Sequence, residues 1–169
     1  MTSKQNRYFE DVADGEKLPL LTKGPLTTAH LMRWSAASEN WHKIHYDRTF
    51  TREHDKLPDL LINGSLKQQF IFEALQAWAK GGWVWKVKFQ FRAMNLVGER
   101  LSVWARVVSK CAQPEYGLVS IEFGIVNDLN LESTPGKATV VLPYRDGSPV
   151  PYPFSPTAAD LASLANNNT

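Results

Sequence analysis

The feature that most constrains the fold of this chain is a change in the spacing of its apolar residues at Gly81 and Gly82. Before the glycines, apolar side chains recur at helical spacing over roughly 16 residues, which predicts a largely buried helix that ends at Gly81. After them, apolar and polar residues alternate through residues 83–92, which predicts a strand with one apolar face. The predicted helix face contains Leu66, Phe70, Ala74, Ala77 and Trp78; the predicted strand face contains Trp83, Trp85, Val87, Phe89 and Phe91.

The alternating pattern returns three more times, over residues 101–107, 119–125 and 138–142. Polar turns at residues 97–99, 113–117 and 127–136 separate these segments, so the strands should be antiparallel neighbours with one apolar face. That face needs a cover, and a long apolar helix precedes it in the chain. We therefore expect an α+β hot-dog fold, in which a curved antiparallel sheet wraps around a long central helix.

The chain divides into one domain and an arm. Residues 1–145 contain the predicted helices and strands, with a further helix after Thr27 or Thr28, where Leu31, Trp34 and Ala37 recur at helical spacing, and a short helix over 48–54. Five of the ten prolines fall between Pro143 and Pro156. Residues 146–169 are therefore read either as an extended, proline-stiffened arm that ends in a short helix or as a disordered tail.

Composition excludes several classes of protein. A single cysteine, Cys111, excludes an internal disulfide framework and a cysteine-based zinc site. The formal net charge of +2 is too small for a nucleic-acid footprint, and no apolar run is long enough to span a membrane. The N-terminal segment lacks the apolar core of a secretion signal, so we expect a cytoplasmic protein.

A polar loop between two predicted helices carries the most chemistry. It contains His42 and His45, with Asn40 before them and Asp47 after them. A zinc site usually takes three or four ligands, often with cysteine or a second histidine pair, so we expect no metal here. A histidine titrates near neutral pH and suits general acid–base catalysis. Cys111, His30 and His54 have no matching partners and are read as structural or solvated.

Gly64 supplies a second candidate element because it opens the long helix. The first backbone N–H groups of a helix have no intrahelical acceptor, and a glycine allows a substrate carbonyl to approach them closely. Such an amide could stabilise an oxyanion. The alternative is that Gly64 only makes a turn before the helix.

These residues resemble the MaoC-like dehydratase/hydratase family from Tyr8 to about Leu142. The family motifs are a loop similar to S-G-D-x-N-P-I-H-x-D, an H-G pair that opens the central helix, and an F-R-x-P-x-x-x-G-D-x-L segment. The matching segments are residues 38–47, residues 63–64 and residues 91–101. Asn40 stands in place of the usual aspartate, Asn63 in place of a histidine and Met94 in place of a proline.

One branch of that family fits the loop better. Type 2 hydroxyacyl-thioester dehydratases and mesaconyl-CoA hydratases resemble N-x-H-K/R-I-H-Y-D here, followed by a Y/L-P-x-L stretch. Residues 40–47 and 57–60 match these patterns, so Asn40 is compatible with an active branch.

The resemblance implies a hydro-lyase acting on 2-enoyl and 3-hydroxyacyl thioesters of coenzyme A or acyl carrier protein. His45 is then the general acid and base, Asn40 orients the water, and the Gly64 amide stabilises the oxyanion. Asp47 or Glu39 would fix the tautomer of the His45 ring. Candidate substrate contacts are His42, Asn63, Trp41, Asp47 and Arg92, the last with Arg100, Lys67, Lys86 and Lys88 as possible cations for the coenzyme phosphates.

The resemblance also implies an assembly and leaves two alternatives. Hot-dog domains pair, so we expect a homodimer or higher oligomer, or a heteromer with a related chain. No cofactor is expected beyond the thioester substrate. Because Asn40 cannot act as an acid, the chain could instead be a weak or inactive subunit that pairs with an active one. A thioesterase on the same fold is the third hypothesis.

Overall fold

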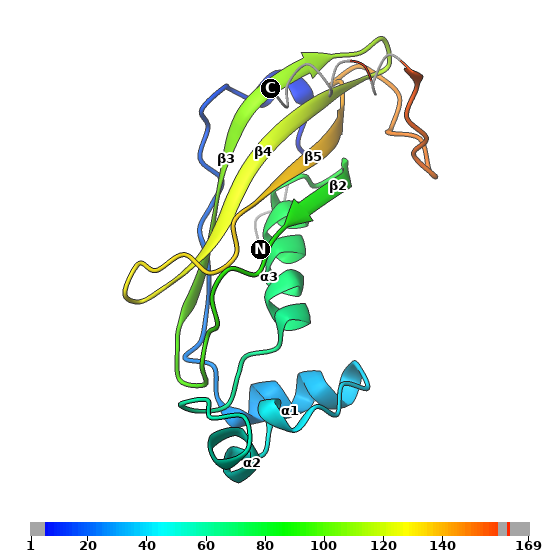
Figure 1. Cartoon of the computed structure of the whole chain (residues 1–169). Coiled ribbons are helices and arrows are strands. Elements are labelled where there is room, and N and C mark those ends of the chain that lie inside the picture. The colour runs from blue at the N-terminus through cyan, green and yellow to red at the C-terminus, as the bar shows by residue number, and fades with distance from the viewer. Residues whose placement is uncertain (1–5, 159–161, 163–169) are drawn as a thin grey trace, which may run out of the picture.

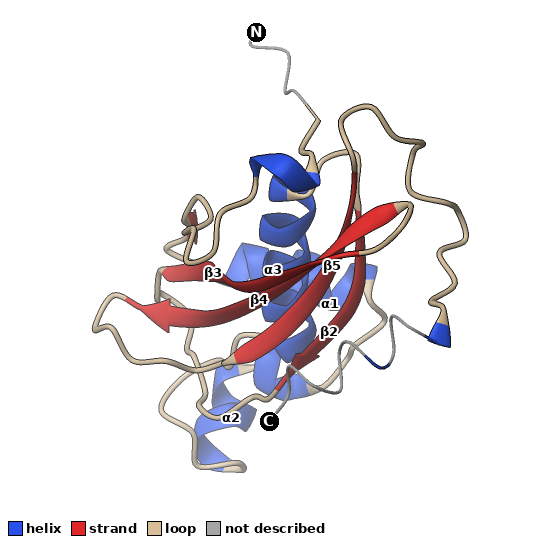
Figure 2. Ribbon diagram, turned by 90° about the horizontal axis from the view of Figure 1, so that it is seen from above, coloured by secondary structure: helices blue, strands red, loops and turns tan. Residues whose placement is uncertain are grey.

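A computed structural model describes residues 6–158 and residue 162, and it shows a curved five-stranded antiparallel sheet that wraps around one long helix (Figure 1). The helix is α3 (Gly64–Trp78), and the strand order is β1-β3-β4-β5-β2. Seen from above, the strands cross over α3 as one layer (Figure 2). The strands are β1 (Leu21–Lys23), β2 (Trp83–Phe89), β3 (Leu101–Ala112), β4 (Tyr116–Asn127) and β5 (Gly136–Pro143). The predicted architecture is therefore confirmed.

The main core lies between α3 and the inner face of the sheet. Its sheet side is built from residues that share one face in the register, such as Val103 opposite Ile125 and Ile121 opposite Ala138. From α3, Ile71 and Leu75 are almost completely buried, whereas Ala77, which we expected on this face, is exposed. Burial of these side chains is the main force that holds the sheet on the helix.

A β-bulge in β2 changes which side chains face the core. The pairing of β2 with β5 shifts register between Val84 and Lys86. As a result Val84, Val87 and Phe89 pack against the main core, while Trp85 packs on the opposite, outer face. The predicted single alternation from Trp83 was therefore wrong at its start, because an extra residue in a strand reverses the faces on one side of it.

The start of the C-terminal arm covers part of the outer face. Tyr116, Leu118 and Val141 form a small second cluster there, and Trp85 packs against it. Phe154 from the arm places its ring 5.2 Å from the rings of both Trp85 and Tyr116. The end of the arm, including most of the expected terminal helix, lies outside the described residues.

The remaining helices lie at one end of α3 (Figure 1). They are α1 (Thr28–Ala37), the short 3₁₀ helix η2 (Lys43–His45) and α2 (Arg48–Glu53), while a further 3₁₀ helix, η1 (Phe9–Asp11), precedes the sheet. Thr27 caps α1 in a capping box completed by His30, which gives that histidine a structural role. In α1 the buried residues are Leu31 and Ser35, whereas Ala37 is exposed. No helix among the described residues is long and apolar enough to cross a membrane.

Candidate active site

The imidazole of His45 is held by a backbone carbonyl. His45 ends η2 and is only 6% exposed, and its Nδ1 lies 2.8 Å from the carbonyl oxygen of Leu61. A second bond joins the same segments, because the Leu61 amide donates to the Ile44 carbonyl at 2.9 Å. A carbonyl oxygen only accepts, so Nδ1 carries the proton in the neutral ring and Nε2 keeps its lone pair. The fold thus presets this ring as a base through Nε2.

Burial controls the protonation of the same ring. Desolvation lowers the pKa of His45 below its ordinary value of 6.5, and the nearby His42 lowers it further, while the bond to the Leu61 carbonyl opposes both effects. A depressed pKa means that the neutral form predominates at neutral pH. His45 is therefore ready to accept a proton under those conditions.

Gly64 begins α3 three residues after Leu61, so it follows directly on the segment that anchors His45. As the first helical residue, it has an amide without an intrahelical acceptor, at the positive end of the helix dipole. The ring of Phe91 lies against it: a Cβ built on Gly64 would be 2.9 Å from Cε2 of Phe91. Phe91 is 51% exposed, so a movable aromatic ring borders this amide.

Ser35 joins the loop and the helix start from the buried face of α1. Its carbonyl accepts a bond from the Asn40 amide at 2.9 Å, and its Oγ accepts from Nδ2 of Asn63 at 3.2 Å. Asn63 is completely buried, and its Oδ1 has no hydrogen-bond partner within the described part of the chain. A buried acceptor without a donor is rare in native proteins, so this oxygen next to Gly64 is a candidate contact for a ligand or water.

Asn40 and His42 complete the polar loop. Oδ1 of Asn40 accepts from the His42 amide at 3.3 Å, and Nδ1 of His42 accepts from the Ile44 amide at 3.4 Å. The rings of His42 and His45 have centroids 6.2 Å apart. Asn40, His42 and His45 are therefore neighbours in one loop, and Ser35 connects Asn40 to Asn63, the residue before Gly64.

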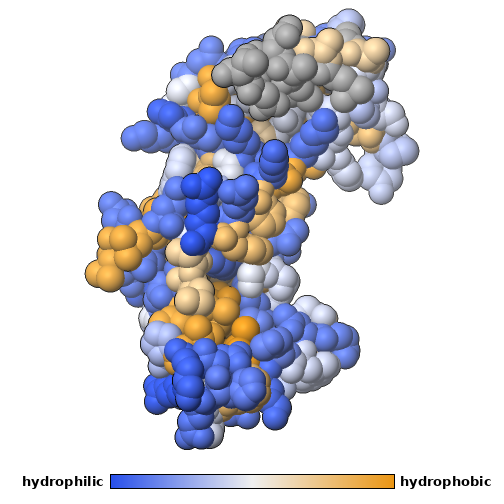
Figure 3. All heavy atoms as spheres, in the orientation of Figure 1, coloured by the Kyte–Doolittle hydropathy of each residue, from blue (hydrophilic) through white to orange (hydrophobic). Residues whose placement is uncertain are grey.

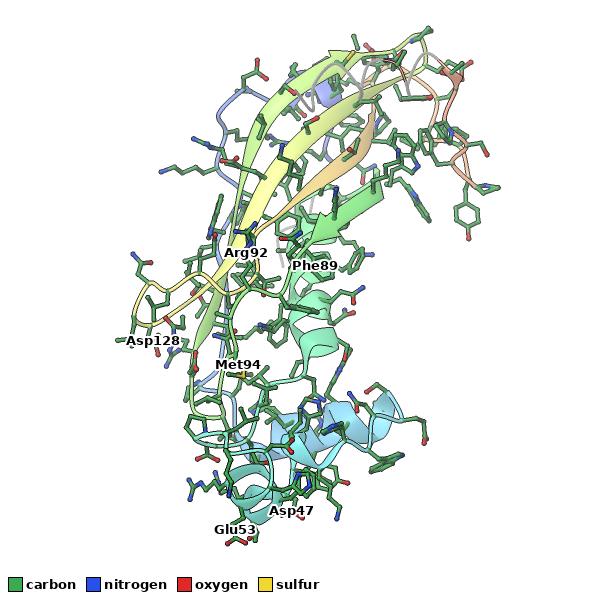
Figure 4. The ribbon with its side chains drawn as sticks, in the orientation of Figure 1. Asp47, Glu53, Phe89, Arg92, Met94 and Asp128 are labelled. Atoms are coloured by element: carbon green, nitrogen blue, oxygen red, sulfur yellow. The ribbon has the colours of Figure 1, made fainter. Side chains whose placement is uncertain are left out.

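Three other residues that we predicted as substrate contacts, Asp47, Trp41 and Arg92, lie or bond outside this group. Asp47 caps α2, with its Oδ1 accepting from the Phe50 amide at 2.9 Å. Trp41 is 52% exposed and donates to Glu39 at 3.0 Å. Since Asp47 and Glu39 bond elsewhere, the expectation that one of them fixes the His45 tautomer was wrong, and the Leu61 carbonyl does so instead. Figure 4 shows Arg92 beside Phe89 on the sheet, far from Asp47 at the helical end.

Lys67 is the most deeply buried lysine among the described residues. It lies one turn after Gly64, is only 3% exposed, and donates to the Ala93 carbonyl at 3.2 Å and to Oδ1 of Asn95 at 3.0 Å. Burial lowers its pKa from 10.5 to about 8, although Glu99 opposes the effect. Its ammonium also lies 5.1 Å from the centre of the Phe91 ring. Lys67 was one of the candidate cations for the coenzyme phosphates; in the structure its ammonium group is buried and bonds to Ala93 and Asn95 inside the fold.

The sequence alone did not reveal four of these features. The Leu61 carbonyl has no sequence signal, because every residue carries one. Phe91 could not be paired with Gly64 without the path of the chain. Ser35 did carry a signal that we did not use: it follows Leu31 by four residues, so it is a polar residue on the buried face of α1. The buried state of Lys67 could have been read from its place between apolar neighbours on α3. Among the described residues, no group of three or more His, Cys, Asp or Glu could hold a metal ion.

Comparisons with known proteins identify the family from the sequence and the fold from solved structures. The family model of type 2 hydroxyacyl-thioester dehydratases matches residues 4–99, more than half of the chain. No curated protein sequence matches significantly.

Three solved structures illustrate the shared architecture. The R-hydratase PhaJ1 from Pseudomonas aeruginosa is 18% identical with a TM-score of 0.73, over 90% of this chain and 97% of that one. A MaoC-like dehydratase from Rhodospirillum rubrum is 17% identical with a TM-score of 0.72, over 83% and 99%. A chain of the ChsH1–ChsH2 complex from Mycobacterium tuberculosis is 12% identical with a TM-score of 0.66, over 77% and 98%. At these identities, the likeness establishes the hot-dog fold of this chain.

Proposed function

Because this chain belongs to the family of type 2 hydroxyacyl-thioester dehydratases, and is therefore a lyase, we propose that it adds water reversibly to 2-enoyl thioesters. The product is the 3-hydroxyacyl thioester of coenzyme A or of acyl carrier protein. His45 serves as the general base and acid, and the Gly64 amide serves as the oxyanion donor. Asn40, Asn63 and His42 are the other polar side chains of the proposed substrate site.

The proposed reaction begins with a water molecule that Nε2 of His45 holds beside C3 of the enoyl group. The water oxygen bonds to C3 as Nε2 takes one of its protons, and the electron pair of the double bond moves toward the thioester oxygen. The Gly64 amide donates to that oxygen and stabilises the enolate. The proton on Nε2 then passes to C2, which restores the neutral ring and the thioester. Dehydration follows the same steps in reverse.

The observation that carries this proposal is the bond between Nδ1 of His45 and the Leu61 carbonyl. This bond leaves Nε2 unprotonated in a ring whose pKa is lowered by burial. The anchoring residue, Leu61, precedes Gly64 by three residues. A base and an oxyanion donor are thereby attached to one short segment. Oδ1 of Asn63 adds a buried acceptor in need of a donor, which a bound water or the 3-hydroxyl of the product supplies.

The experiment is a hydration assay on 2-enoyl-CoA, followed by the loss of ultraviolet absorbance of the conjugated thioester. His45→Asn keeps an amide N–H that can donate to Leu61 but lacks Nε2, so we expect folding to persist and kcat to fall roughly 10²–10⁴-fold. His54→Gln is the matched control, because His54 is exposed and stacks on Phe50 away from this bond. Full activity of His45→Asn would refute the role of His45. Release of free acid and CoA by the wild-type chain would indicate a thioesterase instead.

Asn40 favours a second candidate function, a subunit that supports a catalytic partner chain. An amide cannot exchange a proton as a carboxylic acid can, and one structural neighbour is itself part of the ChsH1–ChsH2 complex. The test is Asn40→Asp in the purified chain. Activity that appears only in Asn40→Asp would support the partner-dependent role, whereas activity in the wild-type chain that this change does not increase would exclude it.

The proposal includes at least a dimer. β1 and β2 are the edge strands of the sheet, and an exposed edge is a surface on which another strand can pair. Light scattering on the purified chain should therefore give a mass of two chains or more. A mass of one chain would contradict this part of the proposal.

A further inference from the structure

The segment that anchors His45 is held by a very short ladder. Residues 60–62 pair with residues 95–97 through a single antiparallel bridge, which joins Leu61 to Leu96. Two backbone hydrogen bonds, of 2.8 and 2.9 Å, flank this bridge. Two such bonds contribute little net stability, so the ladder alone does not fix which residues pair.

The register of this ladder decides where the carbonyl of Leu61 points. Along an extended chain, successive residues direct their backbone groups to opposite sides. The residues on either side of Leu61 bond to residues 95–97. The Leu61 carbonyl points the other way and accepts from Nδ1 of His45 at 2.8 Å. A shift of the pairing by one residue would turn this carbonyl away from the ring.

A chain of polar side chains connects the ladder to α3. The ammonium group of Lys67, one turn after Gly64, donates to Oδ1 of Asn95 at 3.0 Å. Nδ2 of Asn95 donates to Oε2 of Glu99 at 2.9 Å, and Oε1 of Glu99 accepts from the Leu96 amide at 2.7 Å. Lys67, Asn95 and Glu99, which we call the polar network, thus hold the paired segment through a side chain and through the backbone.

The polar network is buried and well paired. Lys67 and Asn95 are only 3% and 2% exposed. Lys67 also donates to the carbonyl of Ala93 at 3.2 Å, and Oε2 of Glu99 also accepts from Nδ2 of Asn127 at 3.1 Å. A buried network whose groups are satisfied rigidifies a structure and specifies one arrangement.

The surroundings of the network indicate that geometry, rather than stability, is the reason for it. Figure 4 labels Met94, the residue before Asn95, and at the same height Figure 3 shows hydrophobic side chains gathered above the hydrophilic helical end. In an apolar place, well-packed apolar side chains often stabilise a fold as much as a buried charged network does, or more. The polar groups are therefore best explained by the arrangement that they specify.

We propose that the polar network has a positioning role in the proposed reaction: it fixes the register of residues 60–62 against residues 95–97 and so keeps the Leu61 carbonyl on the ring of His45. The base is then held from two directions, by its own loop and, through Leu61, by a lysine of α3. This role rests on the proposed function and adds to it the residues that position the base.

The test replaces the network by apolar side chains in the double variant Lys67→Met/Asn95→Leu. Glu99 is half-buried and keeps its bonds from the Leu96 amide and from Asn127. Removal of both partners of a hydrogen bond together is close to neutral for stability, so we expect a urea midpoint near that of the wild type. If the double variant does not fold, Lys67→Met alone serves as the test, with the same expected directions.

The first readout is the titration of the His45 ring, followed by nuclear magnetic resonance and assigned with His45→Asn. Burial lowers the pKa of His45, the bond to the Leu61 carbonyl raises it, and His42 lowers it. When the double variant weakens that bond, the pKa of His45 should fall further below its value in the wild type. This readout needs no catalytic activity, and a general loss of stability would not produce it.

The second readout is the hydration of 2-enoyl-CoA. A misplacement of about 1 Å can cost roughly 10²-fold in rate, so we expect kcat to fall about tenfold or more in the double variant. KM should change little, because the network acts through the base and not on the substrate.

Lys110→Met is the matched control for both readouts. Lys110 of β3 also donates to two backbone carbonyls, those of Phe9 at 3.2 Å and of Val12 at 2.6 Å. Its ammonium group likewise lies over an aromatic ring, 4.6 Å from the centre of Phe9. Because these contacts hold η1 and not the His45 anchor, the control should leave the pKa of His45 and kcat unchanged.

The outcomes separate this inference from the proposed function. A wild-type pKa of His45 together with a wild-type kcat in the double variant would overturn the positioning role and leave the proposed function intact. If the wild-type chain hydrates no enoyl thioester, the proposed function fails. In that case a lowered pKa of His45 in the double variant, but not in Lys110→Met, would still support the positioning of the ring, and an unchanged pKa would overturn it as well.

Discussion

The candidate active site and the groove on the outer face of the sheet use basic side chains in different ways. The groove is lined by Lys86, Lys88, Arg92 and Lys137. At and beside the candidate active site, His45 and Lys67 are buried, and both have lowered pKa values because burial disfavours their charged forms. Their polar partners include backbone carbonyls, those of Leu61 and Ala93. In the groove, Lys88 and Lys137 are exposed side chains, opposed to each other and unpaired within the described structure.

The difference shows that the position of a basic group in the fold decides whether it is neutral or charged. A proton-transfer group needs a fixed position and a controlled pKa, which burial and backbone anchors provide. Exposed lysines, by contrast, keep their positive charge at low cost because water solvates them. Each prediction below would break or sharpen this contrast.

The largest effect is expected at Gly64. In Gly64→Ala the added methyl group would lie 2.9 Å from Cε2 of Phe91 and beside the open amide. We expect a fall of about 10²–10³-fold in kcat/KM, similar to the loss of an oxyanion donor, with little change in the free energy of unfolding. The double variant Gly64→Ala/Phe91→Ala removes the contact with the ring. If it restored full activity, the ring rather than the amide would be the sensitive element.

The next effect concerns the buried lysine. Between pH 8 and 10.5 the unfolded chain binds more protons at Lys67 than the folded chain, so the wild type should gain stability with rising pH relative to Lys67→Met. At 1.36 kcal/mol per pH unit, the gain is on the order of 3 kcal/mol. Urea unfolding at both ends of this interval measures it. The exposed Lys88→Met is the matched control, and it should show no such gain; equal curves for both variants would remove the contrast between buried and exposed lysines.

A smaller effect is expected from the titration of His45. Its pKa lies below 6.5, so kcat/KM for hydration should be constant near neutral pH and fall about tenfold per pH unit below that depressed pKa. Stability should follow the same sign, because between the folded pKa and 6.5 the unfolded chain binds the extra proton and the folded state is weakened as the pH falls. A rate profile with its inflection above 6.5 would contradict the buried, neutral ring.

The smallest effect is a gain in stability. Lys88→Glu places opposite charges at a register pair where like charges now face each other. We expect the free energy of unfolding to rise by about 0.2–1 kcal/mol, and to rise less in high salt. Thermal unfolding at two salt concentrations measures this. A loss of stability would mean that Lys88 is needed for the fold, and the contrast between buried, anchored cations and exposed, opposed ones would fail.

The sequence predicted the large elements well because their signal is repeated along the chain. The switch of period at Gly81 and Gly82 located α3 and the four long strands, and Thr27 marked the start of α1. It did not predict β1, which has only three residues, or the bulge after Val84, which reverses a face without changing the composition. Both depend on pairing with a distant strand, and a local pattern does not contain that information.

The polar loop of residues 40–47 and the glycine that opens α3 were recognisable from sequence, because specific side chains at fixed spacing mark them. The role of each side chain was decided by tertiary structure. The Leu61 carbonyl became the anchor of His45, Asp47 became a helix cap, and Arg92 came to lie on the outer face beside Lys88 and Lys137. Residue type determines what chemistry a group can perform, whereas burial and neighbouring atoms, which only the folded chain brings together, determine whether it is charged, anchored or free to bind.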